Sequence, residues 1–166
     1  MNVVNTLSFS RTHTANYVSD KMRNLLKTLI LDYGLDPKQL VDAWSGWVHD
    51  AAREWMQTGD LVKFVIEFYR PGDSYAVARW DFPIRYDGAD IDQMWVDRDF
   101  LQGSIAKAPR PPAGCTYRVL LVPRANARSL PGLSDTPFLS LGSLAPREAG
   151  TVIGTPDIMA SATYYR

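Results

Sequence analysis

The feature that most constrains this chain is a segment near its end that is apolar but has no regular period. Residues 129–150 read SLPGLSDTPFLSLGSLAPREAG and contain five Leu and one Phe, yet four Ser, three Pro and three Gly interrupt every run. A loop this long is uncommon in a compact domain unless the loop itself has a function. We therefore expect a covering segment here rather than a helix or a strand.

Two amphipathic helices are predicted in the first third of the chain. The first should start after residue 10, with Ser10 or Thr12 as its N-cap and Gly34 in the left-handed position after its last turn. Asp36 is placed to cap the second helix, which should end at Gly59. The two apolar stripes, with spacings of three and four, are Val18, Met22, Leu25, Leu26, Leu29 and Tyr33, then Leu40, Trp44, Trp47, Val48, Ala51 and Trp55.

The hydrophobic period then changes to two, which is typical of strands. Residues 61–70 and 74–86 alternate on either side of an Arg-Pro-Gly-Asp turn and predict an antiparallel hairpin. Pro83 cannot donate to a ladder, so the second strand should lie at an edge or be bulged there. A short helix from Asp97 to Ala108 and a third strand at 116–122 complete an α+β layer.

A sheet of this kind has open edges, and an open edge pairs with other chains unless something covers it. The tail from Arg124 onward is the remaining material that can cover one. We expect a single domain over residues 1–166, with short strand-like pieces around 136–141, 150–154 and 161–165.

Composition excludes several classes of function. Lys plus Arg equals Asp plus Glu at 18 each, so the net charge is zero, which argues against nucleic acid or an anionic membrane as the main partner. Neither a signal peptide nor an apolar run long enough to span a bilayer is visible, so a cytoplasmic location is expected. With Cys115 as its one cysteine, the chain cannot form an internal disulfide.

No catalytic arrangement is apparent, and neither an enzyme nor a cofactor is expected. His13 and His49 are the two histidines, and neither stands in a recognisable nucleophile–base pattern. Asp87, Asp90 and Asp92 lie close together in a loop and could hold Mg²⁺ or Ca²⁺, so a metal-dependent hydrolase remains a third hypothesis.

Several stretches, taken in order, resemble the bacterial HORMA domain family, in its family 1 type. They are SFSRTHTANYVSDKMRNLL, RWDFPIRY, MWVD, CTYRVLLV and the ending GTVIG with SATYYR. The similarity runs from about residue 7 to the C-terminus, and its specificity comes from the order and joint presence of these stretches. This family occurs beside cGAS/DncV-like nucleotidyltransferases in CBASS antiphage systems.

The resemblance implies a three-stranded antiparallel core sheet, three helices on one side of it and a C-terminal safety belt that wraps a closure-motif peptide. The belt would be residues 124–166, the core 11–123, and residues 1–10 a handle for an AAA+ remodelling ATPase, with Met1, Asn2, Val3, Val4 and Asn5 at its start. The closed, peptide-bound protein would bind and activate the nucleotidyltransferase. Some systems contain a second HORMA protein, which donates or captures a peptide.

The residues themselves can be given roles in such a switch. The free edge of the third strand is the natural place for a peptide to add as an extra strand. The short helix should supply selectivity pockets, residues 129–150 should form the strap, and Tyr164 or Tyr165 should latch the terminal strand to the other sheet edge. The predicted peptide-binding residues are Phe100, Leu101, Ser104, Ile105, Tyr117, Arg118, Val119, Leu120, Leu121, Val122 and Phe138.

An alternative remains open at this point. The tail could be a fixed cover that completes the sheet, in which case the protein is a constitutive structural or assembly adaptor of the same fold. The two hypotheses differ in whether residues 124–150 change position when partners bind.

Overall fold

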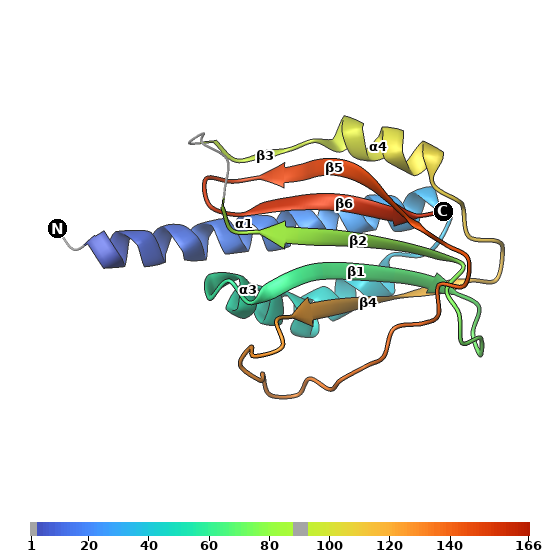
Figure 1. The fold of residues 1–166 in the computed structure, drawn as a ribbon, viewed down its shortest axis with the longest axis horizontal. Coiled ribbons are helices and arrows are strands. Elements are labelled where there is room, and N and C mark those ends of the chain that lie inside the picture. Colours follow the sequence, from blue (N-terminus) through green and yellow to red (C-terminus); the bar gives the residue numbers. More distant parts are fainter. Residues whose placement is uncertain (1–2, 88–92) are drawn as a thin grey trace.

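The computed structural model describes residues 3–87 and 93–166, with side chains from Arg11 onward. Its helices are α1 (Val3–Asp32), α2 (Lys38–Ala43), the π-helical turn η1 (Trp44–Val48), α3 (His49–Gln57) and α4 (Arg98–Lys107). Its strands are β1 (Leu61–Tyr69), β2 (Ala78–Arg85), β3 (Trp95–Val96), β4 (Thr116–Pro123), β5 (Pro146–Gly154) and β6 (Met159–Tyr165). Figure 1 shows the strands side by side in one sheet with α1 and α3 behind it.

The sheet has six strands in the order β3-β5-β6-β2-β1-β4, and every neighbouring pair is antiparallel. The predicted α+β class is confirmed, and the three predicted core strands are the neighbours β2, β1 and β4. The terminal strand was expected on the sheet edge away from β4, where β6 lies, whereas β3 and β5 were not assigned to the sheet. The hairpin of β5 and β6 comes from the tail and pairs with β2 through β6, on the side of β1 away from β4.

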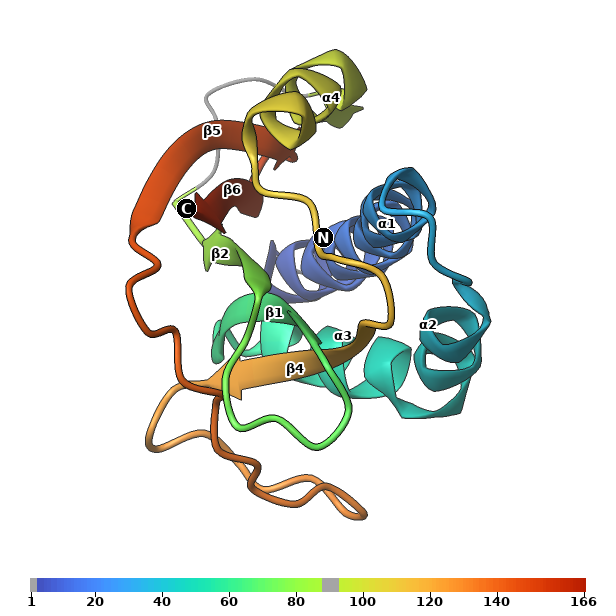
Figure 2. The same cartoon turned by 90° about the vertical axis from the view of Figure 1, so that its right-hand side faces the viewer.

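One face of the sheet is covered by the helical layer, as Figure 2 shows. The main core lies at this interface, where the Trp44 ring stacks on Phe64 with centroids 5.7 Å apart. Trp80 Nε1 donates a hydrogen bond of 3.0 Å to the hydroxyl of Tyr33, and burial raises the pKa of Tyr33 to about 12. The aromatic and apolar stripes of both predicted helices therefore meet the inward face of the hairpin.

Helix α1 starts earlier than its hydrophobic period predicts. The backbone is helical from Val3, so Ser10 and Thr12 lie inside the helix and neither begins it. The N-terminal end of α1 extends past the sheet (Figure 1). The helix start predicted after residue 10 is thus wrong, whereas the handle role of residues 1–10 stays a prediction. Met1 and Asn2 lie outside the described residues. The other end agrees with the prediction, since Gly34 has φ +76°.

The second predicted helix is confirmed as one rod of α2, η1 and α3. Asp36 Oδ1 accepts the N–H of Lys38 at 2.9 Å at its start, and Gly59 with φ +76° ends it. The rod contains a π-helical turn that the apolar spacing did not predict. Trp47 lies in this turn and is 37% exposed, so it is not a core residue as its position in the stripe suggested.

Pro83 lies in an interior strand whose pairings show no register shift, so neither the edge nor the bulge that was predicted for it is found. Strand β2 is flanked by β1 and β6. The pairing of β2 with β6 includes Asp81 with Thr163 and Ile84 with Ala160, but skips the two positions between them. Because proline has no N–H to donate, the ladder is interrupted at Pro83 without the strand being at an edge.

Helix α4 begins as predicted, because Asp97 Oδ1 accepts the N–H of Phe100 at 2.9 Å. Leu101 and Ile105 are buried, and α4 packs against β5 and α1. Among the helices that the structure describes, none combines the length and the apolar content that crossing a bilayer requires.

Candidate binding edge of the sheet

Strand β4 forms one end of the sheet and pairs only with β1 among the described strands. Its side chains are mostly half-buried, apart from the buried Tyr117. An unpaired strand edge offers a row of N–H and C=O groups to which an extended peptide can add. This edge of β4 is the candidate binding edge.

The main-chain groups that face outward can be identified from the pairing. The N–H of Val77 donates to the carbonyl of Phe68 at 2.8 Å, so the main-chain groups of Phe68 point to the β2 side. Phe68 lies opposite Tyr117 in the register of β1 and β4. Main-chain groups alternate between the two sides of a strand, so those of Tyr117, Val119 and Leu121 point away from β1. These groups form the candidate binding edge.

Residues 124–145, here called the belt loop, connect β4 to β5 and start on the helical side of the edge. The N–H of Arg124 donates to the carbonyl of Asp60 at 2.8 Å. The carbonyl of Arg128 accepts Trp55 Nε1 at 2.9 Å, and its guanidinium pairs with Glu54 at 2.7 Å. The first part of the belt loop is therefore attached to α3.

The later part of the belt loop is attached to the opposite, outer face of the sheet. The N–H of Leu139 donates to Glu67 Oε2 at 2.8 Å, and Arg118 Nη2 donates to the carbonyl of Pro137 at 2.7 Å. Residues 129–136 thus pass from one face to the other around the edge of β4. Figures 1 and 2 show this segment running beyond β4, outside the sheet.

Apolar side chains of the belt loop, such as Leu130 and Leu133, pack against the core but are only partly buried. Every residue from 124 to 145 is exposed or half-buried, and Phe138 is 43% exposed. The hairpin that follows differs sharply, since Ile153, Ile158 and Ala160 are fully buried. Because burial of apolar area is the main stabilising contribution, the belt loop can leave its position at a lower free-energy cost than the hairpin.

The outer face under the belt loop carries buried charges. The side chain of Glu67 is fully buried and accepts from Arg118 Nε at 2.6 Å. Asp81 accepts from Arg79 Nε at 2.7 Å and from Lys63 Nζ at 2.8 Å. Burial alone would raise the pKa of Asp81, but the hydrogen bonds from Arg79 and Lys63 outweigh it and hold the pKa below its ordinary value.

Phe138 of the belt loop rests on this charged surface. The Arg79 guanidinium lies 4.3 Å from the centroid of its ring, a cation–π contact. The hydroxyl of Tyr165 donates to Asp81 Oδ2 at 3.1 Å, beside the same arginine. The seam between the belt loop and the sheet is therefore largely polar and aromatic.

The structure brings together one part of the predicted peptide-binding set and separates the other. Residues 117–122 lie in β4, where alternate residues form the candidate binding edge, and Phe138 lies on the adjoining outer face. The predicted residues of α4 are elsewhere, because α4 packs on β5, which β6, β2 and β1 separate from β4. The expected pockets from Phe100, Leu101, Ser104 and Ile105 do not line this edge, so that placement is wrong.

The two tyrosines of the terminal strand lie on opposite faces. Tyr164 packs on Trp80 with ring centroids 5.3 Å apart, and Tyr165 reaches Asp81 on the outer face. Strand β6 pairs with β2, on the side of β1 away from β4. The latch role of these residues stays a prediction, as does the handle role of Val3 to Asn5.

The proposed metal site falls mainly outside the described residues. Asp90 and Asp92 belong to residues 88–92, which lie outside the described part of the chain. Asp87 is exposed, and its Oδ1 lies 3.8 Å from Nε of Arg85. Within residues 3–87 and 93–166, no group of three or more His, Cys, Asp or Glu side chains is arranged to hold a metal ion.

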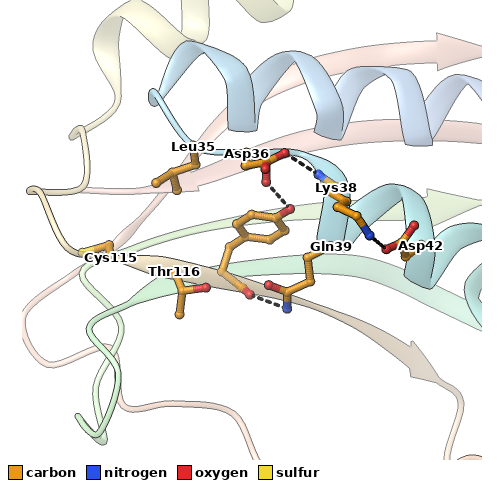
Figure 3. A pocket seen from close by; sticks show the side chains of 8 residues that line it. Leu35, Asp36, Lys38, Gln39, Asp42, Cys115 and Thr116 are labelled. Carbon is orange, nitrogen blue, oxygen red and sulfur yellow. Dashed lines mark hydrogen bonds and ion pairs between the residues drawn. The ribbon is translucent and has the colours of Figure 1, made fainter.

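A cavity beside the start of β4 was missed at the sequence level. Its volume is about 540 Å³, and Figure 3 shows its lining. It lies between α2 and β4, and no local pattern signals it because the two elements are far apart in sequence. The lining residues are Leu35, Asp36, Lys38, Gln39, Asp42, Cys115, Thr116 and Tyr117.

Comparison with solved structures identifies this architecture as a known fold. A chain of the mitotic checkpoint complex superimposes with a TM-score of 0.71 at 12% identity, covering 92% of this chain and 97% of that one. The C. elegans protein HTP-2 bound to the HIM-3 closure motif gives 0.52 at 15% identity, covering 79% and 71%. The E. coli HORMA:CdnC:Trip13 complex gives 0.59 at 13% identity, covering 93% and 89%.

A search of curated protein sequences finds no match. The sequence profile of the family described as Bacterial HORMA domain 2 matches residues 1–166. The resemblance stated above was to the family 1 type. The profile that matches is that of the second type, so the subtype is corrected, and the match spans the whole chain. The chain belongs to the bacterial HORMA domain family.

Proposed function

We propose that this chain is a peptide-capturing conformational switch. A short closure-motif peptide would add to the free edge of β4, and the belt loop would hold it there. Support comes from the fold, which is shared with C. elegans HTP-2 solved with a closure motif. The chain would act by binding and carry no catalytic activity of its own.

One observation carries the proposal: an unpaired strand edge is enclosed by a loop that is attached on both of its sides. Trp55 and Glu54 hold the loop on the helical side, and Glu67 and Arg118 hold it on the outer face. A strand inserted under residues 129–136 would bond to β4 along its main chain and be retained by the loop. Main-chain pairing gives affinity, and side-chain pockets give selectivity.

In its closed state the protein would bind and activate a cGAS/DncV-like nucleotidyltransferase in antiphage defence, and an AAA+ ATPase would open it. The fold is shared with the HORMA chain of an E. coli complex that also contains CdnC and Trip13. The position of β6 on β2, which leaves β4 free for a peptide, is consistent with a closed state.

A specific observation favours the second candidate, a constitutive adaptor with a fixed tail. The hairpin of β5 and β6 is built into the sheet, and Val152, Ile153, Ile158 and Ala160 have no exposure. Such burial resists any movement of the last part of the tail. The two candidates differ in what the belt loop does when partners bind.

Limited trypsin digestion distinguishes them. Cleavage after Arg124 and Arg128 in the belt loop is compared with cleavage after Lys107, at the end of α4 and outside the loop. We expect the cognate nucleotidyltransferase, together with a peptide selected from a random library, to slow cleavage in the loop severalfold and to leave Lys107 unchanged. Equal rates in the loop with and without the partners would contradict the switch and favour the fixed adaptor.

A further inference from the structure

The first outward carbonyl of the candidate binding edge already has a hydrogen-bond partner. Gln39 Nε2 donates to the main-chain oxygen of Tyr117 at 3.2 Å (Figure 3). The start of α2 is fixed to β4, because the Tyr117 hydroxyl donates to the carbonyl of Asp36 at 2.7 Å and accepts the N–H of Leu40 at 3.1 Å. The Gln39 amide therefore occupies the position that an N–H of an added strand would take.

The opposite end of the edge is closed by a different residue. Outward positions alternate along β4, so Pro123 follows Leu121 on the free side. Proline has no N–H and cannot donate to a further strand. The next residue, Arg124, already binds the carbonyl of Asp60 and begins the belt loop.

We infer that Gln39 and Pro123 bound a short pairing window on β4, and that Gln39 sets the register of the captured peptide. This inference rests on the peptide capture proposed above. Between these two limits, Val119 and Leu121 are the residues whose N–H and C=O groups can both bond to a peptide strand. At about 3.3 Å per residue, a window opposite residues 118–122 holds about five peptide residues.

A fixed register matters because a slip of one residue turns every side chain of a strand to the other face. Alternate peptide side chains would lie beside Val119 and Leu121 on the helical side, and the others beside Leu120 and Val122 on the outer face. Gln39 thus makes selectivity possible although the main-chain bonds themselves do not distinguish sequences.

The cavity beside α2 lies where the window ends. Its lining includes Gln39 and residues 115–117, and its volume is about 540 Å³. A peptide that stops pairing before Tyr117 has room to leave the strand direction there. Residues beyond the window would turn away from β4 into this open space, where they make no further ladder bonds and add little affinity.

The test uses peptides selected on the wild-type protein from a random library of about twelve residues, then shortened one residue at a time. In the wild type, we expect affinity to stop rising once the peptide reaches the Gln39 end of the window. The Gln39→Ala variant frees the Tyr117 carbonyl, so longer peptides should gain about five-fold in affinity, the effect of one hydrogen bond. The control Gln102→Ala changes an exposed amide on α4 and should leave the wild-type length dependence unchanged.

A ligand-free measurement tests the same contact. The side-chain amide protons of Gln39 should exchange with solvent more slowly than those of Gln102 in the free protein. Two results would overturn the register inference and leave peptide capture intact. One is equal exchange rates of the Gln39 and Gln102 side-chain amides. The other is the same dependence of affinity on peptide length in wild type and Gln39→Ala, measured with peptides that bind. If no library peptide binds the wild type, peptide capture fails and this inference fails with it.

Discussion

At the scale of single residues, the attachment of the belt loop depends on a buried carboxylate. Glu67 has no exposed side-chain area and shares its two oxygens between Arg118 and the N–H of Leu139. Hydrogen bonds to an ionised group are about twice as strong as neutral ones, so this one side chain links β1, β4 and the loop. When the loop leaves, Glu67 and Arg118 can be hydrated, which limits the cost of opening.

Replacing Glu67 by Gln should therefore loosen the belt loop specifically. The amide keeps the shape but removes the charge that pairs with Arg118, and its single oxygen can accept from only one of the two donors, Arg118 Nε and the N–H of Leu139. We expect a loss of about 3 kcal/mol in the free energy of unfolding, measured in urea, because a buried ion pair is broken. Trypsin should also cleave the variant faster after Arg124 and Arg128.

The matched control is Glu54→Gln, which removes the exposed ion pair between Arg128 and α3. Exposed pairs contribute roughly 0 to 1 kcal/mol, so this variant should remain close to the wild type in stability. Equal effects of the two substitutions would contradict a special role for the buried carboxylate.

Asp81 gives the outer face a defined dependence on pH. Its pKa is lowered in the folded protein, since the hydrogen bonds from Arg79 and Lys63 outweigh the effect of burial. The carboxylate therefore stabilises the fold above its unfolded pKa of about 3.9, and this contribution is lost as the pH falls through the lower, folded value. The difference in unfolding free energy between wild type and Asp81→Asn should be constant from pH 7 to about 5 and shrink in more acidic solution. A difference that grows on acidification would refute this assignment.

The polar face could be predicted from sequence only in part. Alternation places Lys63 and Glu67 on the same side of β1, opposite Phe64 and Phe68. It does not show that residues 137–139 cover that side, because the belt loop has no period and its contacts are set by tertiary structure. Gln39 was missed for the same reason, since it reaches β4 across 78 positions of sequence.

At the scale of elements, most predictions that rest on local chemistry are confirmed, although the N-cap of α2 is Pro37 and not Asp36. Asp97 caps α4, Asp36 accepts an N–H at the start of α2, and glycines end the first two helical rods. The start of α1 was missed because hydrophobic periodicity records burial, whereas a helix that is already nucleated extends at little further cost. Strand β5 was predicted only around 150–154, because its first residues are exposed and include a proline.

The glycines of β5 make room for aromatic side chains of neighbouring elements. A Cβ on Gly154 would overlap the indole of Trp95 in β3, and a Cβ on Gly150 would lie 2.8 Å from the Phe100 ring of α4. Gly154→Ala should therefore displace β3 and lower the free energy of unfolding by about 2 kcal/mol, within the range for overpacking. Thermal or urea denaturation measures this loss.

Gly103→Ala in α4 is the matched control. A Cβ there meets nothing within 4 Å, so the substitution should stabilise the protein by up to about 1 kcal/mol through helix propensity. A Gly154→Ala variant as stable as the wild type would show that β3 can move away from β5 without cost.

At the scale of the whole molecule, the two ends of the chain are connected. Arg11 of α1 pairs with Asp157, in the turn between β5 and β6, with Nε and Oδ2 2.5 Å apart. The same guanidinium lies 5.3 Å from the centroid of the Tyr86 ring beyond β2. A change near the N-terminal end of α1 can therefore reach the C-terminal hairpin directly, without passing through the belt loop. We expect the belt loop and the hairpin to open as two separate units of the tail, although the main chains of Ala145 and Arg166 bond to each other where the two meet.

Hydrogen exchange of single amides tests this division through Arg11→Gln. The variant removes the ion pair at the hairpin turn, so the amides of Thr155 and Ile158, which are bonded within that turn, should exchange about five-fold faster. That change corresponds to about 1 kcal/mol, as expected for a pair that is partly exposed to solvent. The amide of Leu139 is held by Glu67 and should keep its wild-type rate. Lys38→Gln, which removes an exposed pair with Asp42, should change neither rate. If hydrogen exchange at the Leu139 amide becomes faster together with exchange in the turn in Arg11→Gln, the tail opens as one unit. The N-terminal end of α1 then acts on the belt loop and the hairpin at once.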